Sequence, residues 1–437
     1  MSRPSRALLR VLLPALAASG LAAQDALTIQ DAIRKAWTGQ SGLQAGAARV
    51  ERAQAEAEAL GRLRLPTVTL GAALTRTDEP MQVFGTRLDQ ARIGPQDFLP
   101  DRLDHPDPLT GGAAYLTVAQ PLYAGGKLDA ARRAGAALAE AETAAQAFRR
   151  QQVALAVDQA YFGAQVARQA LAWAEDTLRQ ARETERFVRA RVQEGLMLKS
   201  EGERARAFRA QSEAGVAEAR ERLAAARNAL ALLMGDEPPE SLATPVAAGE
   251  ADLPETPGRR GDLDALRAQG EAARQGIAAA RGSLKPEVGL NLTAGTARYA
   301  LADGGNWTAV AVGARWTFSF ADRPRVHAAR AAARAAELGL QWQTRQADRD
   351  AADARLALAS ARSRIASAQE ALEASEGVRA MRLARHREGL LPLVEVLDAE
   401  SGLSGARTLL LNSQLDGRLA RARLALALGQ PIEDVKE

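Results

Sequence analysis

The chain has 437 residues and a formal net charge of +4, with 25% charged residues, 4% aromatic residues and no cysteine. The absence of cysteine excludes disulfides, thiolate metal sites and a lipid-modified N-terminal cysteine. Abundant charge with few aromatic residues favours long helices that pack closely through small side chains over a thick globular core.

The first 23 residues have the pattern of a secretory signal peptide. A basic stretch containing Arg3, Arg6 and Arg10 precedes an apolar run, and Ala22 and Ala23 supply small residues for cleavage. The apolar run is shorter than the ~20 residues of a membrane-spanning helix, which disfavours the alternative of an N-terminal anchor. Removal of this segment leaves a nearly neutral chain, so the charge does not predict a nucleic-acid partner.

Similar segments recur in the same order in the two halves of the chain. The tripeptide EGL at 194–196 recurs at 388–390, and LPTVTLGAAL at 65–74 resembles KPEVGLNLTA at 285–294. Such recurrence predicts an internal duplication. We expect a first repeat over 24–235, a Pro-rich segment between the repeats over 236–261, and a second repeat over 262–437.

Four segments alternate apolar and polar residues with a period of two. Alternation over about ten residues, with aromatic residues at the ends, is typical of outer-membrane strands. Four strands cannot close into a barrel, and lipid tolerates no open sheet edge, so several copies of the chain must contribute strands to one barrel. The alternative is a small sheet of a soluble protein. The segments are 67–75, 115–123, 287–295 and 310–320.

A long stretch rich in Pro, Asp and Gly, at 76–112, separates the first two of these segments. Its counterpart in the second half, 298–308, is much shorter. This composition predicts a surface loop, which would be extracellular if the strands cross the outer membrane.

Each half ends in a long stretch with helical periodicity. The stretch from about Gly126 to Arg191 contains no proline and predicts a helix of roughly 65 residues, or ~100 Å. A helix of this length needs a neighbour, and we expect antiparallel partners over 197–234 and 391–428. Glycine suits the turns at the two tips, which are expected at Gly195 and Gly389.

Together these residues resemble the TolC-type outer membrane efflux protein family, the outer membrane factors. The resemblance covers nearly the whole mature chain and is carried by the repeated order of elements, by QPLYAGGKLDAAR and by EGLLPLVEVLDAE. It implies a fold that is mainly α with a membrane β-barrel portion. Long helical hairpins would form a periplasmic α-barrel, and four strands per chain would join a 12-stranded barrel shared by a homotrimer.

The resemblance also implies a location and partners. The protein would lie in the outer membrane of a Gram-negative bacterium and extend far into the periplasm. It would be the passive exit duct of a tripartite efflux system for drugs, toxic compounds or metal ions. Its partners would be a periplasmic membrane-fusion adaptor and an inner-membrane pump of the RND or ABC type. The alternatives are type I protein secretion and, in another class, a soluble periplasmic coiled-coil adaptor or scaffold.

No enzyme, cofactor or metal site is expected. The sequence lacks a phosphate-binding loop, a dinucleotide-binding glycine motif and a nucleophile elbow. The three histidines, at 105, 327 and 386, are far apart, and none has metal-ligand spacing with a carboxylate.

Glu395 and Asp398, in the second tip, lie three residues apart and share a helix face. The acidic rings that narrow the entrance in the resembled family fall on these two residues. Carboxylates crowded around a threefold axis would repel one another and attract cations. The alternative is that both are ordinary solvated charges.

The remaining tip residues are expected to latch and to dock. The resemblance places the family's tyrosine position at His386, its arginine position at Leu391 and an acidic partner at Glu201. A pH-sensitive contact between His386 and Glu201 is one interpretation, and an ordinary surface histidine is the other. Exposed apolar turns favour adaptor docking, although the same residues would also staple their own hairpins. The expected docking residues are Gly195, Leu196, Met197, Gly389, Leu390 and Leu391.

Overall fold

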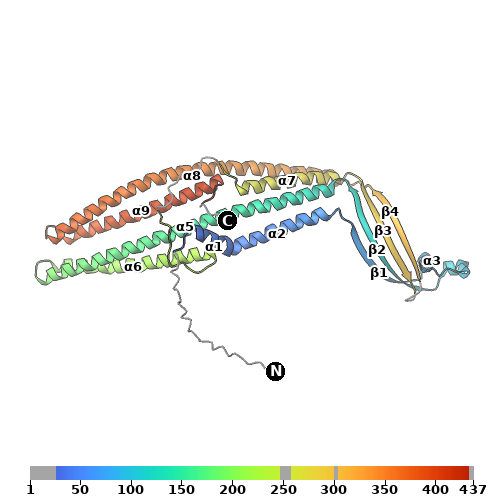
Figure 1. Cartoon of the computed structure of the whole chain (residues 1–437), viewed down its shortest axis with the longest axis horizontal. Coiled ribbons are helices and arrows are strands. Elements are labelled where there is room, and N and C mark those ends of the chain that lie inside the picture. Colours follow the sequence, from blue (N-terminus) through green and yellow to red (C-terminus); the bar gives the residue numbers. More distant parts are fainter. Residues whose placement is uncertain (1–25, 247–256, 300–303, 433–437) are drawn as a thin grey trace, which may run out of the picture.

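A computed structural model describes residues 26–246, 257–299 and 304–432. The expected signal peptide and part of the Pro-rich segment lie outside the described residues. The molecule is elongated, with helical hairpins at one end and a sheet at the other (Figure 1). None of the described helices combines the length and the apolar composition needed to cross a membrane.

Two very long helices form the shaft. Helix α5 (Lys127–Gln193) has 67 residues and α8 (Asp322–Arg387) has 66, so each spans ~100 Å. Each reverses at a tip and returns as a 36-residue helix, α6 (Lys199–Met234) or α9 (Leu393–Leu428). The expected hairpins are therefore confirmed, with ends displaced by about two residues. The other helices of the shaft are α1 (Ile29–Gly39), α2 (Ser41–Arg62) and α7 (Gly261–Gly282).

Small side chains allow these helices to approach closely. On α5 the buried residues include Ala130, Ala137, Ala141, Ala154 and Ala181. Helix α2 packs against α5, and α7 lies against both α5 and α8. The alanine-rich composition thus produces close helix packing with few large residues.

Beside each long helix, shorter helices meet end to end at a glycine contact. Gly39, at the end of α1, lies against the backbone of Gly235, which caps α6, and a Cβ at either position would collide with the other segment. In the second half, Gly258 N donates to Leu428 O at 2.7 Å, where α9 ends. We call these two contacts the glycine seams.

The principal core lies near the middle of the shaft. Ile29, Ile33, Tyr161, Phe162 and Leu230 are fully buried there. The hydroxyl of Tyr161 donates to Leu27 O at 2.6 Å and accepts from Thr244 N at 2.8 Å. Tyr161 therefore attaches both the N-terminal segment and the segment after α6 to α5.

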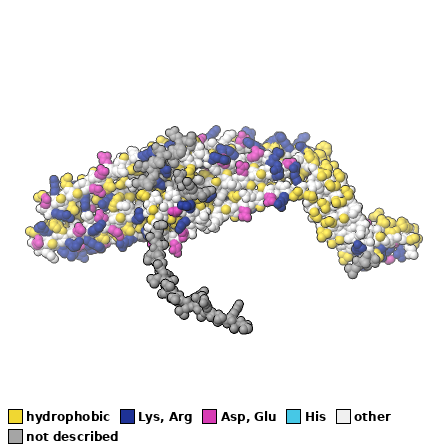
Figure 2. Space-filling view, viewed as in Figure 1, with side chains coloured by type: hydrophobic (Ala, Val, Ile, Leu, Met, Phe, Trp, Pro, Cys, Tyr) yellow, Lys and Arg dark blue, Asp and Glu magenta, His cyan; other side chains and the backbone are white. Residues whose placement is uncertain are grey.

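The sheet has four antiparallel strands in the order β1-β2-β3-β4. Hydrophobic side chains gather over it (Figure 2), and Leu70, Leu74, Val310 and Val312 are each at least 69% exposed. Strands β1 and β4 are the two edges. The strands are β1 (Thr67–Thr77), β2 (Leu109–Ala124), β3 (Glu287–Arg298) and β4 (Gly304–Arg315).

The strand expected to run to residue 320 ends earlier, at Arg315. Arg315 pairs with Glu287, the first residue of β3, so the residues that follow have no neighbouring strand. Trp316 instead donates from Nε1 to Leu284 O at 3.1 Å, and Phe320 is fully exposed. The alternation of apolar and polar residues continues past Arg315 because it reflects which side chains face an apolar surrounding, and not only which residues pair with a neighbouring strand.

The prediction that residues 76–112 form a loop is partly wrong. Its ends belong to β1 and β2, and its interior contains α3 (Pro80–Asp89), the 3₁₀ helix η1 (Pro95–Phe98) and α4 (Pro100–Asp104). Each short helix begins with proline, which is preorganised for the first helical position. The prolines therefore start helices here rather than excluding them.

Candidate functional site at the helical tips

The two turns at the tips have the same geometry. Gly195 and Gly389 adopt left-handed conformations, with φ of 75° and 77°. The next residue in each turn donates back to the helix, Leu196 N to Arg191 O at 2.8 Å and Leu390 N to Arg385 O at 2.9 Å. This is a Schellman cap, which requires a positive φ that glycine adopts without strain. The expected role of both glycines in the turns is confirmed.

An apolar cluster beneath the turns joins the two hairpins. Val188 of α5, Ala205 of α6, and Leu393 and Val396 of α9 are buried together. Because these residues come from both hairpins, the cluster holds the tips side by side.

The expected docking residues fall into two groups. Leu196 and Leu390 are 61% and 69% exposed, whereas Met197 packs on the tip cluster and Leu391 is half-buried. A cavity of about 410 Å³ lies between the turns and is lined by residues of both. Met197 therefore staples the tips, as one interpretation expected, whereas Leu196 and Leu390 face solvent, and adaptor docking through them stays a prediction.

His386 is buried, so the expectation of an ordinary surface histidine is wrong. Its Nδ1 lies 2.8 Å from Leu391 O, and its ring meets the edge of Phe187 at 5.9 Å between centroids. Because a carbonyl can only accept, Nδ1 carries the proton. Glu201 approaches Leu393 N at 3.5 Å instead of His386. Both side chains fasten the second turn, but through its backbone rather than through each other.

Glu395 and Asp398 share an arginine of their own chain. Arg382 Nη1 lies 3.1 Å from Glu395 Oε2 and 2.7 Å from Asp398 Oδ2, and it also donates to Glu395 O at 3.0 Å. The side chain of Asp398 is 75% exposed, that of Glu395 44% and that of Arg382 30%. Arg382 is not among the residues predicted from the sequence, because it lies across the turn, 16 residues before Asp398.

Above the tips, further arginines connect the hairpins. Arg379 of α8 pairs with Glu400 of α9 at 2.6 Å and also bonds to Gln180 of α5. Arg407 of α9 lies 3.6 Å from Asp176 of α5. These contacts continue the joint between the hairpins from the tips towards the middle of the shaft.

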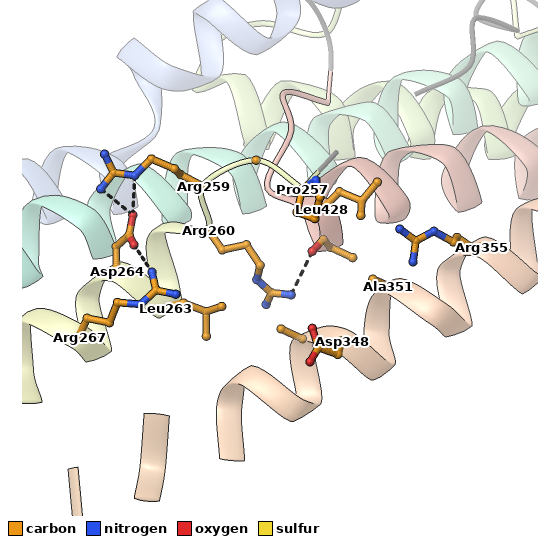
Figure 3. Close-up of a pocket in the computed structure, with 13 residues that line it drawn as sticks. Pro257, Arg259, Arg260, Leu263, Asp264, Arg267, Asp348, Ala351, Arg355 and Leu428 are labelled. Atoms are coloured by element: carbon orange, nitrogen blue, oxygen red, sulfur yellow. Dashed lines mark hydrogen bonds and ion pairs between the residues drawn. The ribbon is translucent and has the colours of Figure 1, made fainter. Parts of the chain in front are cut away.

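A second cavity, of about 430 Å³, lies where the segment before α7 meets α8 and the end of α9 (Figure 3). Three of the four arginines that line it form bonds within the fold. Arg259 and Arg267 both bond Asp264, and Arg260 pairs with Asp262 and donates to Ala427 O. In the described part of the chain, no three His, Asp or Glu side chains are grouped to hold a metal ion. The tips therefore remain the candidate site.

The profile of the outer membrane efflux protein family matches residues 32–236 and 253–430. The chain belongs to the outer membrane efflux protein family. This efflux protein is therefore an outer-membrane channel protein and not an enzyme. Membership also excludes the soluble periplasmic scaffold as its function.

Solved structures show the same fold. A CusC structure is 21% identical with a TM-score of 0.79 and covers 92% of each chain. VceC of Vibrio cholerae is 22% identical with a TM-score of 0.77, covering 93% of this chain and 97% of its own. The open MtrE outer membrane channel of Neisseria gonorrhoeae is 21% identical with a TM-score of 0.79, covering 94% of this chain and 91% of its own. A search of curated proteins finds no match. The expected fold class, long helical hairpins with a strand portion, is confirmed.

Proposed function

We propose that three copies of this efflux protein combine into one duct. The observation that supports this most strongly is the four-stranded sheet, whose edges β1 and β4 have no partner within the described chain. Lipid cannot satisfy the N–H and C=O groups of an open edge. Pairing β1 of each copy with β4 of the next would satisfy both edges and close a 12-stranded barrel.

Engineered cysteines test this arrangement cleanly because the chain contains none of its own. Thr69→Cys on β1 is combined in turn with Ala309→Cys, Ala311→Cys and Gly313→Cys on β4, because the register between copies must be found by scanning. At one register, oxidation should give covalent trimers on a denaturing gel.

The matched control is Thr117→Cys with Thr293→Cys, on adjacent strands whose hydroxyls are 3.2 Å apart. It should form a bond within one chain and migrate as a monomer. A scan that gives no bond between chains, while the control oxidises, would contradict the shared barrel.

The assembled protein would act as a passive duct for small molecules. The shaft extends ~100 Å from the sheet, and its entrance would be the tips, where Glu395 and Asp398 of three chains form an acidic ring. A membrane-fusion adaptor would dock there, and an inner-membrane pump of the RND or ABC type would supply the energy. The side chains at the entrance provide charge and shape but no group activated for a reaction, which suits gating and filtering.

Conductance in planar bilayers tests the ring. Glu395→Gln with Asp398→Asn should lower the conductance for K⁺ and weaken block by Mg²⁺, because it removes the negative charge that concentrates cations at the narrowest point. Unchanged conductance and unchanged block would refute an acidic entrance at these residues.

A further inference from the structure

Arg382 is placed to set the charge of the entrance. It lies on α8, seven residues before the turn glycine Gly389, and a single nitrogen of its guanidinium contacts both acidic side chains. The same nitrogen donates to the backbone oxygen of Glu395. An arginine stays protonated at any physiological pH, so its charge is a permanent feature of the site.

This contact changes the charge at the tip. Two carboxylates alone would place two negative charges per chain at the entrance, and Arg382 cancels one of them. Exposed ion pairs of this kind contribute little to stability. Arg382 still changes the electrostatic potential at the entrance, because that potential depends on which charges are present and not on how strongly the arginine binds the carboxylates.

The contact also lies entirely within one hairpin. Arg382 joins α8 to the first turns of α9, so the three side chains would move together if the second hairpin swings. The balance of charge is then the same whether the entrance is narrow or wide. A bond to a neighbouring copy would instead break when the entrance opens.

We propose that Arg382 determines the ion selectivity of this efflux protein by holding the acidic ring at half its formal charge, with the carboxylates tied to their own hairpin. The inference rests on the proposed function, because it requires three tips around one entrance. Arg382 acts here as a specificity-determining residue. It keeps the entrance attractive to cations without making it a tight cation-binding site.

The test is the reversal potential of the reconstituted channel in a KCl gradient, with half-block by Mg²⁺ as a second measurement. Arg382→Gln should raise the permeability of K⁺ relative to Cl⁻ by about tenfold, the effect of three charges removed at ~10 Å in a largely aqueous entrance. It should also lower the Mg²⁺ concentration for half-block. Arg382→Lys, which keeps the charge, should behave like the parent protein.

Arg364→Gln is the matched control. Arg364 also bridges α8 to α9, through Asp416 at 3.2 Å, but it lies 18 residues, or about 27 Å, further from the tip. Its loss should leave selectivity unchanged. Unchanged selectivity in Arg382→Gln, or an equal change in Arg382→Lys, would overturn the proposal.

The failure of this inference and that of the proposed function can be told apart. If Glu395→Gln with Asp398→Asn alters selectivity but Arg382→Gln does not, the ring exists and Arg382 does not tune it. If neither variant alters selectivity, the acidic entrance itself is refuted.

Discussion

Arg418 of α9 lies 3.6 Å from Asp158 of α5, and the two side chains are 5% and 0% exposed. The guanidinium also covers the ring of Phe162, at 4.2 Å from its centroid. This buried pair connects the second hairpin to the first near the middle of the shaft.

Asp158→Ala should lower the stability of the helical shaft by about 3–5 kcal/mol, because it removes the carboxylate that lies beside the buried charge of Arg418. The measurement is the thermal midpoint of the helical circular-dichroism signal in detergent. Asp158→Leu with Arg418→Met should recover most of the loss, since an apolar pair of similar volume removes both buried charges. The exposed ion pair between Arg364 and Asp416 offers a control. Arg364→Gln breaks it and should change the thermal midpoint little. Equal midpoints for Asp158→Ala and Arg364→Gln would show that the buried pair contributes nothing special.

His386→Ala should loosen the second tip. It removes the donor to Leu391 O and opens a space beside Phe187, at a cost of about 2–4 kcal/mol. Trypsin should then cleave faster at Arg385 and Arg387, next to the turn. His105→Ala, at an exposed position in the loop between β1 and β2, is the control and should leave the rate unchanged. A tip that resists trypsin equally in both variants would rule out His386 as a fastener.

Leu196→Asp with Leu390→Asp should abolish cross-linking to the adaptor while the trimer remains intact, because both side chains are exposed and support no core. Leu196→Met with Leu390→Met keeps the apolar surface and should retain the cross-link. Met197→Asp should instead lower heat stability, since Met197 packs on the tip cluster. Adaptor cross-linking that survives the double Asp variant would place docking elsewhere.

The loop between β1 and β2 should become less ordered in acid. The backbone N–H of Gly94 donates to Asp97 at 2.8 Å, and this bond, with the charge of Arg87 2.6 Å away, lowers the pKa of Asp97 below its ordinary 3.8 while burial opposes the shift. A lowered pKa in the folded state means that the stabilisation is present above pH 3.8 and is lost as the pH falls through the folded-state pKa.

Hydrogen exchange in α3 and α4, corrected for intrinsic rates, measures this change. It should accelerate as the pH falls below 3.8 and through the lowered folded-state pKa of Asp97. Asp97→Asn should show faster exchange already at pH 7, whereas Asp78→Asn, at an exposed position, should not. Exchange that is independent of pH in the parent protein would argue against Asp97 as the staple of this loop.

The sequence predicted those features that are local along the chain. The long helices follow from uninterrupted periodicity, and the turns follow from Gly195 and Gly389, because a left-handed cap favours glycine wherever it occurs. The four strands follow from alternation, but the end of β4 does not, because it is set by where β3 begins rather than by the residues of β4.

The contacts that could not be predicted from the sequence are those between helices, because they depend on how the helices are aligned with one another. Arg382 meets Glu395 and Asp398 only because α8 and α9 are aligned by the turn, and one residue of slip would direct the guanidinium elsewhere. The burial of His386 depends on Phe187, 199 positions earlier in the chain by numbering and on the other hairpin. A histidine in a charged, alanine-rich stretch carries no local sign of such a neighbour.

The glycine seams have a mechanical consequence. Helices α5 and α8 are continuous at the level of the glycine seams, where the shorter helices beside them end. The shaft therefore contains two continuous long helices, each flanked by shorter helices that meet end to end. Bending strain introduced at the entrance should be relieved at those joints, where the backbones of two segments lie directly against each other. The sheet at the membrane end would then keep its conformation while the helical tips rearrange. A mutation that disturbs the tips would accordingly leave the structure of the sheet unchanged.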